Sequence, residues 1–352
     1  MNLWAAATLG RTQPLVSTPL GGDASFRRYF RYQRDNGGTW LLVDAPPEQE
    51  DNAAFLRAAD EFRAADLPVP HVLTSDLELG FLMLEDFGDR LYLPALQEAQ
   101  RQADMQKVDQ LYGQAMQALL KLQQRPLPSA LPDYDQMLLE RELQLFDEWF
   151  CERMLGLELS AAERSLLNNT WRLLIDAALQ QPQVRVHRDY HSRNLMIRET
   201  STGEPMTAAL PGIIDFQDAV VGPITYDLVS LLRDCYIVWP DADVERWLRG
   251  FHQRAQAQAI IPQCHTLERF RRDFDLMGLQ RHIKVLGIFS RLYLRDGKAR
   301  YLADLPVVMQ YVVNIAERHP EMTDFVTWLR AGPLPAIHQR LADLGMTAAR
   351  PI

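Results

Sequence analysis

Cysteine is scarce in this sequence, and long apolar runs are absent from it. The 352 residues include only three cysteines, Cys151, Cys235 and Cys264, which lie too far apart for a metal motif or a disulfide framework. No stretch reaches the roughly 20 apolar residues that cross a bilayer. The first residues also lack the basic segment and apolar run of a signal peptide. We therefore expect a cytoplasmic protein without a membrane partner.

Positive charge is also limited. Lysine and arginine total 37 against 46 aspartates and glutamates, which gives a net charge of −9 and a pI near 5.4. An acidic chain is poorly suited to nucleic acid, so we expect none as a partner. Any anion that the protein binds must therefore be held by a local positive site or by a metal ion. We expect a monomer that acts on a small molecule.

The residues that are present indicate two lobes. Hydrophobic residues make up 47% of the chain, which is ample for a large core. Up to residue 86 the patterns predict strands at 26–32, 40–43, 71–73 and 81–84, a turn at 35–38 and a helix at 52–65. Later patterns predict helices at 137–155, 160–178, 225–237, 244–257, 267–296 and 306–317. Ser160 and Glu163 are expected to form a capping box at the start of the second of these. We expect a strand-rich lobe at 1–86 and a mostly helical lobe at 87–352.

One loop carries a recognisable catalytic pattern. His187-Arg188-Asp189 is followed by Asn194, which matches H-R-D-x-x-x-x-N. In kinase-like catalysis the aspartate accepts the proton of the attacking hydroxyl, and the asparagine holds a metal ion. Phosphoryl transfer requires an aligned nucleophile and positive charge beside the phosphates, and a loop with both residues places them close together.

A second segment completes the pattern. Residues 212–216 form a short apolar strand that ends at Asp215. A buried strand fixes the direction of that carboxylate, as a metal site requires. Magnesium prefers hard oxygen ligands, so Asp215 is predicted as its main ligand, together with Asn194. A single Asp or Asn in a loop is most often only a turn residue, and it is the combination that predicts phosphoryl transfer.

These segments, with Gly222 to Leu228, resemble the aminoglycoside phosphotransferase and choline kinase family. The resemblance implies an α+β, protein-kinase-like bilobal fold, ATP and Mg²⁺ as cofactors, and a hinge at 85–88, where Glu85 and Phe87 lie near adenine. Segments such as Asp23 to Tyr29 and Asp44 to Glu48 are similar to the family's bacterial amino-sugar kinases. That similarity implies phosphorylation of N-acetylmuramate and N-acetylglucosamine at the C1 hydroxyl during cell-wall recycling.

The sequence departs from the kinase pattern around the phosphates. The glycine-rich loop is reduced to Gly21 and Gly22, followed by Ser25, whose hydroxyl is a candidate phosphate donor. The strand at 40–43 has no lysine, and none precedes Lys107. Guanidinium groups bind phosphate bidentately, so Arg28 is the favoured replacement and Arg31, on the opposite strand face, is an alternative. Both arginines also fit an ordinary surface role.

Residues predicted to contact the sugar come from two later helical segments. They are Arg233, Tyr236, Trp239, Arg281 and Lys284. Cations suit the carboxylate of N-acetylmuramate, and aromatic rings suit a sugar face. The competing interpretation is that these are solvent-facing or helix-capping side chains. Two other functions remain open: a kinase for an aminoglycoside or another hydroxyl compound, and a non-catalytic nucleotide-binding protein.

Overall fold

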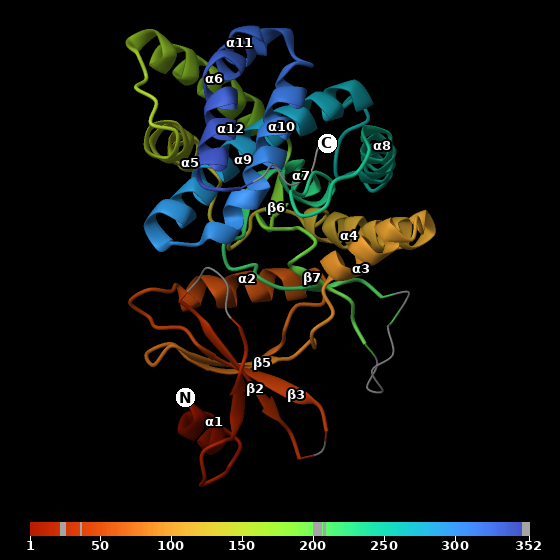
Figure 1. Cartoon of the computed structure of the whole chain (residues 1–352). Coiled ribbons are helices and arrows are strands. Elements are labelled where there is room, and N and C mark those ends of the chain that lie inside the picture. Colours follow the sequence, from red (N-terminus) through yellow and green to blue (C-terminus); the bar gives the residue numbers. More distant parts are fainter. Residues whose placement is uncertain (22–25, 36, 200–205, 207–208, 347–352) are drawn as a thin grey trace. The chain divides into compact units, whose positions relative to one another are not determined.

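The computed structural model describes residues 1–21, 26–35, 37–199, 206 and 209–346 (Figure 1). The chain forms two compact units. The first contains Met1–Pro132 and His187–Val220, and the second contains Asp133–Val186 and Val221–Ile352. The first unit continues past residue 86 to Pro132, and the lobe boundary expected after residue 86 stays a prediction.

The first unit is built on a five-stranded antiparallel sheet with strand order β1-β2-β3-β5-β4. The strands are β1 (Ser17–Pro19), β2 (Arg28–Gln33), β3 (Thr39–Asp44), β4 (Val72–Asp76) and β5 (Phe81–Glu85). The predicted hairpin is β2–β3, in which Arg28 lies opposite Asp44. Gly37 and Gly38 both adopt positive φ, at 80° and 77°, as a tight hairpin turn requires.

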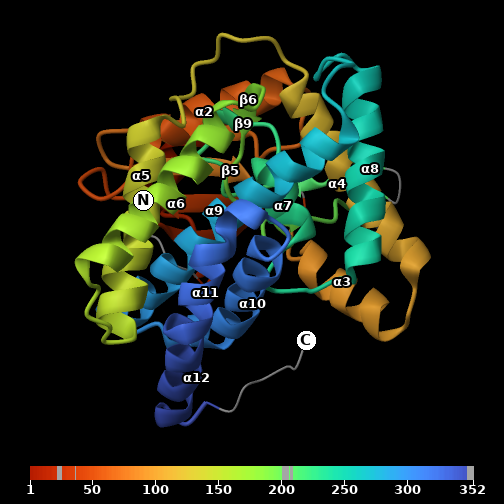
Figure 2. The ribbon, with the colours of Figure 1, turned by 90° about the horizontal axis from the view of Figure 1, so that it is seen from above.

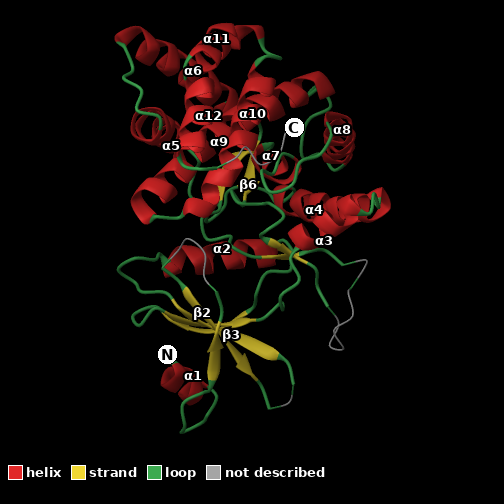
Figure 3. Ribbon diagram, viewed as in Figure 1, coloured by secondary structure: helices red, strands yellow, loops and turns green. Residues whose placement is uncertain are grey.

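Four helices complete this part of the first unit: α1 (Asn2–Thr8), α2 (Asn52–Ala64), α3 (Tyr92–Arg101) and α4 (Met105–Gln123). Helix α1 packs its Ala5 and Ala6 against a core that includes Tyr32, Leu42 and Met83. Helix α2 lies on the other side of the sheet (Figure 3). Asp51 caps the start of α2, since its side chain accepts a hydrogen bond from Ala54 N.

The chain returns to the first unit at His187 and adds a small antiparallel ladder. This ladder pairs β7 (Leu195–Met196) with β8 (Gly212–Ile213), so that Leu195 faces Ile213. Both strands are buried. The sequence also predicts a turn at 200–205, which lies outside the described residues. The ladder fixes where the residues just before β7 and just after β8 lie.

The second unit is mostly helical (Figure 2). Its helices are α5 (Gln136–Leu145), the π-helix η1 (Phe146–Met154), α6 (Ala161–Leu179), α7 (Tyr226–Leu232), α8 (Asp241–Ala257), α9 (Leu267–Asp296), the 3₁₀ helix η2 (Ala299–Asp304), α10 (Leu305–Ala316), the 3₁₀ helix η3 (Pro320–Met322), α11 (Thr323–Ala331) and α12 (Pro333–Asp343). A two-stranded sheet pairs β6 (Gln183–Val186) with β9 (Val220–Pro223). Within the described ranges, no helix is long and apolar enough to cross a membrane.

Several predicted helices have the expected bounds, and two differ. Helix α9 spans the predicted 267–296, and the predicted capping box of Ser160 and Glu163 opens α6. The helix expected at 137–155 is instead divided into α5 and the π-helix η1. The helix expected at 225–237 ends at Leu232. The first difference falls at Leu145, where the backbone packs against Gly287.

Helix α9 is the centre of the second unit, and Gly287 sets how closely it approaches α5. A Cβ atom at Gly287 would clash with the main-chain carbonyl carbon and oxygen of Leu145, the last residue of α5. Two backbones approach this closely only where one side has no side chain. The α5–η1 junction therefore lies directly against Gly287.

We expect Gly287→Ala to lower the free energy of unfolding by about 2–3 kcal/mol, because the added methyl group overpacks a backbone contact. The midpoint of urea unfolding measures this change. The matched control is Gly250→Ala on α8, where a Cβ would meet nothing within 4 Å. That change should stabilise the helix by roughly 0.5–1 kcal/mol. Equal effects of the two substitutions would contradict the close approach at Gly287.

Candidate active site

The β7–β8 ladder brings the predicted metal ligands together. Asn194 lies just before β7 and Asp215 lies two residues after β8. Ile214 N donates to Asn194 O at 3.1 Å, which extends the ladder to the two ligands. Asn194 Nδ2 then donates to Asp215 Oδ2 at 3.2 Å. Two residues separated by 21 positions in the sequence are thus neighbours in the structure.

Asn194 also binds the backbone of the predicted catalytic aspartate. Its Nδ2 donates to Asp189 O at 3.0 Å, and His191 N donates to the same oxygen at 3.0 Å. The side-chain nitrogen Nδ2 of Asn194 therefore donates hydrogen bonds to both Asp189 and Asp215. The side-chain oxygen Oδ1 is left as the atom with which Asn194 can bind a cation.

His187 is a buried, neutral ring that links the catalytic loop to the segment after β8. Its Nε2 donates to Ile214 O at 3.0 Å, and its Nδ1 accepts from Asp189 N at 3.2 Å. Burial lowers the pKa of His187 to about 4, although the charge of Asp189 acts in the opposite direction. The ring stays neutral at physiological pH, and a neutral ring is what allows one nitrogen to donate and the other to accept.

This histidine should make stability depend on pH. The unfolded chain has the ordinary histidine pKa, so it binds the proton more tightly than the native state. The stabilisation is complete above pH 6.5 and is lost as the pH falls towards 4, by about 3 kcal/mol for this group. We expect His187→Asn to be less stable at pH 7 and to show a flatter loss between pH 6.5 and 4.

The measurement is the free energy of unfolding of each variant at several pH values. His71→Asn is the control, because His71 is an exposed histidine of the same unit. It should leave the pH dependence of the wild type unchanged. If His187→Asn keeps the full wild-type dependence, His187 is not the group that titrates.

Two residues of the site adopt a backbone conformation that side chains disfavour. Arg188 has φ 76° and Asp215 has φ 64°, in the left-handed region. Each such residue costs about 1–2 kcal/mol, and such strain concentrates at functional sites. Arg188 is held there by a bond from its Nη1 to Asp218 O at 3.3 Å. Asp215 is held between Asn194 and Gln217, whose Nε2 donates to Asp215 Oδ1 at 3.0 Å.

The electrostatics of Asp215 suit a cation. Surrounding protein and, next, the negative charge of Asp189 raise the pKa of Asp215, against the bond from Gln217. Asp215 is nevertheless open to solvent, which weakens the contribution of burial and leaves the charge of Asp189 as the stronger influence. Repulsion between two carboxylates is relieved when a metal ion binds beside them. The donor set therefore fits magnesium.

Among the described residues, no group of three or more His, Cys, Asp or Glu side chains could form a complete metal site. Magnesium sites commonly use one or two protein oxygens together with the substrate phosphates. Asp215 and Asn194 Oδ1 are the residues that would hold it.

Helix α2 anchors both catalytic segments through aromatic packing. Phe216, next to Asp215, is fully buried, with its ring centroid 4.9 Å from Phe55 and 5.6 Å from Phe62. The ring of His187 lies 5.6 Å from Phe62 in an edge-on arrangement. Such aromatic pairs contribute about 0.5–1.5 kcal/mol beyond the area that they bury. The sequence predicted α2 but gave no signal of this anchoring role.

The predicted hinge residues occupy the end of β5 and the turn after it. Glu85 accepts a hydrogen bond from His71 N at 3.2 Å through Oε2, and its own amide donates to His71 O at 2.8 Å. Phe87 lies against β8, since a Cβ on Gly212 would be 2.6 Å from its ring. The nucleotide roles of Glu85, Phe87 and Gly21 stay predictions. Gly22 and Ser25 lie outside the described residues.

The two arginines predicted to replace the strand lysine both have acidic partners. Arg28 pairs with Asp44, and its side chain is 67% exposed. Arg31 pairs with Asp86 at 2.5 Å and with Asp89 at 2.8 Å. Arg28 shares its face of β2 with Phe30, which packs against the α1 core. A phosphate role for either residue stays a prediction.

Most of the predicted sugar-contacting residues are buried within the second unit. Arg233 pairs with Asp275 at 2.6 Å, and Lys284 pairs with Glu142 at 3.0 Å. Trp239 packs edge-on against Trp247, with centroids 5.7 Å apart. Arg281 is buried, and Tyr236 is half-buried. Long-range partners such as Glu142, which the sequence could not reveal, give these side chains structural roles. Their substrate roles stay predictions.

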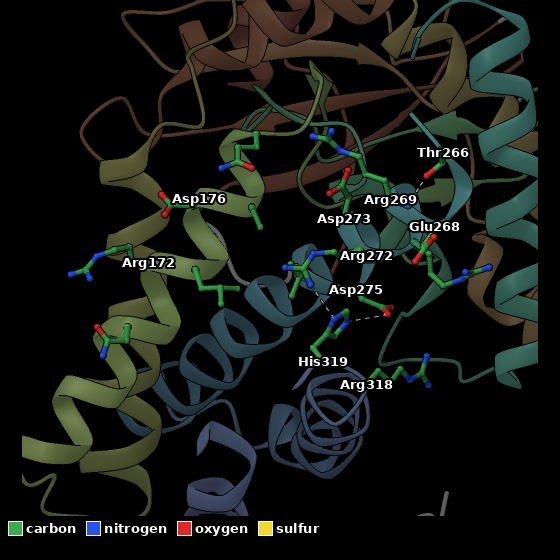
Figure 4. A pocket seen from close by; sticks show the side chains of 16 residues that line it. Arg172, Asp176, Thr266, Glu268, Arg269, Arg272, Asp273, Asp275, Arg318 and His319 are labelled. Atoms are coloured by element: carbon green, nitrogen blue, oxygen red, sulfur yellow. Dashed lines mark hydrogen bonds and ion pairs between the residues drawn. The ribbon is translucent and has the colours of Figure 1, made fainter. Parts of the chain in front are cut away.

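A large open groove of about 1130 Å³ also lies in the second unit (Figure 4). Its lining is rich in charge, but several of these charges are paired: His319 with Asp275 at 3.3 Å, and Arg318 with Asp241 at 2.6 Å. Asp189, Asn194 and Asp215 all belong to the first unit. We therefore assign this groove no part in the chemistry of the catalytic loop.

A loop that places an aspartate and an asparagine beside a strand-end carboxylate matches the arrangement used in phosphoryl transfer. The comparison with known families agrees. A model described as the phosphotransferase enzyme family matches residues 16–265, and the chain belongs to that family. It is therefore an enzyme, a kinase that phosphorylates a hydroxyl group, and kinases of this kind use ATP.

Two curated relatives bear the name N-acetylmuramate/N-acetylglucosamine kinase. The protein of Pseudomonas putida is 42% identical over 94% of this chain and 92% of its own length. The protein of Pseudomonas aeruginosa is 41% identical over 94% of this chain and 93% of its own length. The predicted family resemblance is thereby confirmed.

The fold is also shared with a solved structure. An ADP-bound aminoglycoside phosphotransferase matches with a TM-score of 0.56, at 12% identity, over 90% of this chain and 99% of that one. At this identity the likeness concerns the fold alone. It confirms the predicted α+β, protein-kinase-like fold, with its strand-rich N-terminal part and helical remainder.

Proposed function

We propose that this kinase transfers the γ-phosphoryl group of ATP to N-acetylmuramate and N-acetylglucosamine, at the anomeric C1 hydroxyl. The observation that carries the proposal is the cluster of Asp189, Asn194 and Asp215 joined by hydrogen bonds of 3.0 and 3.2 Å. The choice of sugar is supported by the relatives that carry these substrates in their names. The product would be the sugar 1-phosphate, formed during cell-wall recycling.

In the proposed mechanism Asp189 orients the C1 hydroxyl and accepts its proton as the oxygen attacks phosphorus. His187 and Asn194 hold the backbone of Asp189, so the carboxylate needs little rearrangement. Mg²⁺, when bound by Asp215 and Asn194 Oδ1, would neutralise charge on the phosphates. An anomeric hydroxyl is more acidic than other sugar hydroxyls, so a carboxylate is an adequate base for it.

Phosphorylation at C1 can be tested through the loss of the reducing end of the sugar. A sugar phosphorylated at C1 loses its reducing end, whereas a sugar phosphorylated at another hydroxyl keeps it. We expect ATP consumption to match the loss of reducing sugar for N-acetylmuramate and N-acetylglucosamine. A product that still reduces would overturn the C1 assignment. Turnover with aminoglycosides but with neither sugar would instead support the alternative family activity.

The cellular setting follows from this chemistry. ATP and recycled amino sugars are both available in the cytoplasm, so we propose that the enzyme acts there. We further propose that it acts as a monomer, because Asp189, Asn194 and Asp215 all come from one unit of a single chain. Gel filtration at assay concentration tests the monomer, and activity confined to a larger species would contradict it.

A further inference from the structure

The side chain that supplies positive charge to the phosphates of ATP has not yet been assigned. Strand β3 carries Thr39–Asp44 without a lysine, and the first lysine of the chain is Lys107. Phosphoryl transfer nevertheless depends on cations placed against the phosphates. An arginine of the N-terminal sheet is the remaining type of side chain that can supply a permanent charge there.

Arg27, immediately before β2, differs from its neighbours in being buried. Its side chain is only 3% exposed and pairs with Glu50 Oε2 at 3.3 Å. Its guanidinium carbon also lies 5.5 Å from the ring centroid of Phe55 on α2. The second oxygen of Glu50 accepts from Phe26 N at 2.9 Å. One carboxylate thus holds both the backbone and the side chain at the entrance to β2.

One chain of ring contacts and one electrostatic link connect Arg27 with Asp215. The ring of Phe55 under the guanidinium packs on Phe216, the residue after Asp215. Tyr29, two residues further along, also interacts electrostatically with both Arg27 and Asp215. Arg27 and Tyr29 share one face of the strand, whereas Arg28 points to the other.

We propose that Arg27, positioned by Glu50, contacts the phosphates of ATP and replaces the missing strand lysine. The proposal rests on the proposed function, in which the phosphates lie beside Asp215. A guanidinium group has five N–H donors in a planar fork, so it can serve a carboxylate and a phosphate at once. Glu50 is a positioning residue that fixes the direction of this fork. The sequence favoured Arg28. It could not single out Arg27, because the partner Glu50 is distant in sequence.

The principal test is Arg27→Met, which keeps the length of the side chain and removes its charge. We expect kcat/KM for ATP to fall by about 10²–10³-fold, as for the loss of one preorganised phosphate or oxyanion donor. Arg28→Met tests the alternative and should change kcat/KM by less than about threefold, as expected for an exposed ion pair. Arg57→Met, another paired arginine of this unit, is the control and should be silent. A large loss in Arg28→Met with none in Arg27→Met would overturn the proposal.

A binding measurement separates this inference from the identity of the sugar. Calorimetry with Mg²⁺ and a non-hydrolysable ATP analogue needs no acceptor, so it remains informative if neither sugar is turned over. We expect Arg27→Met to weaken this binding at least tenfold and Arg27→Lys to recover part of it. Unchanged affinity in folded Arg27→Met would refute a phosphate contact, whatever the sugar assays show.

A third variant covers the case in which Arg27→Met does not fold. Glu50→Gln keeps the shape and can still accept from Phe26 N, but it loses its charge. We expect the folded variant to raise KM for ATP more than it lowers kcat, because Arg27 is still present but its direction is no longer fixed. The double variant with Arg27→Lys should lose less than the two single effects combined. Fully additive losses would mean that Glu50 does not act through Arg27.

Discussion

Replacing Asp189 by asparagine is expected to lower kcat by about 10³-fold while ATP affinity changes less than about threefold. Asparagine has the size of aspartate but cannot accept the proton of the attacking hydroxyl. The backbone of Asp189 makes two of the hydrogen bonds that shape the loop: its carbonyl oxygen accepts from Asn194 Nδ2 and its amide donates to His187 Nδ1. The substitution removes the base and keeps both of these bonds.

The measurement is steady-state kinetics with N-acetylmuramate, together with direct titration of an ATP analogue. Asp60→Asn, at an exposed position on α2, is the control and should match the wild type. A variant that retains more than a tenth of the wild-type kcat would show that Asp189 is not the base. Lost turnover with retained nucleotide binding would also exclude the hypothesis of a non-catalytic nucleotide-binding protein.

Asp215→Asn should abolish most activity for a different reason. We expect kcat to fall by about 10³-fold and the Mg²⁺ concentration needed for half-maximal activity to rise, because a neutral amide is a weaker magnesium ligand. Asparagine tolerates the left-handed φ of 64° better than most residues, so the backbone should persist. The substitution thus separates the charge of the ligand from the conformation that presents it.

The melting temperature of Asp215→Asn provides a second, independent test. The pKa of Asp215 is raised in the native state by burial and by Asp189, so the ionised carboxylate destabilises the fold at neutral pH. We therefore expect the melting temperature of Asp215→Asn, without Mg²⁺, to be unchanged or higher. Lower activity combined with a clearly lower melting temperature would indicate a structural defect instead. Gln217→Ala, which removes a hydrogen-bond partner but no charge, is the useful comparison.

Local sequence signals predicted the parts of this protein that are set by local physics. The turn at 35–38, the capping box at Ser160 and the long helical pattern of α9 each lie within one segment of the sequence. The catalytic pattern from His187 to Asn194 is also local. These features needed no knowledge of distant residues, which is why they could be located in advance.

The features that the sequence did not reveal depend on partners far along the chain. Arg27 differs from Arg28 because Glu50 and Phe55 lie on its side of the sheet. Lys284 is a buried ion-pair residue because Glu142 lies opposite it. The periodicity of a helix or strand does not indicate which distant carboxylate will pair with a given cation. Phosphate-site and sugar-site residues were therefore harder to assign than the catalytic loop.

The division of the first unit into two separate stretches of chain has a consequence during protein synthesis. Helix α2 leaves the ribosome early, but Phe216, which packs on Phe55 and Phe62, belongs to the later stretch. At about 5–20 residues per second, those rings wait on the order of ten seconds for their partner. The nascent chain thus exposes an aromatic surface for a defined interval. In that interval it is most open to aggregation or to capture by a chaperone.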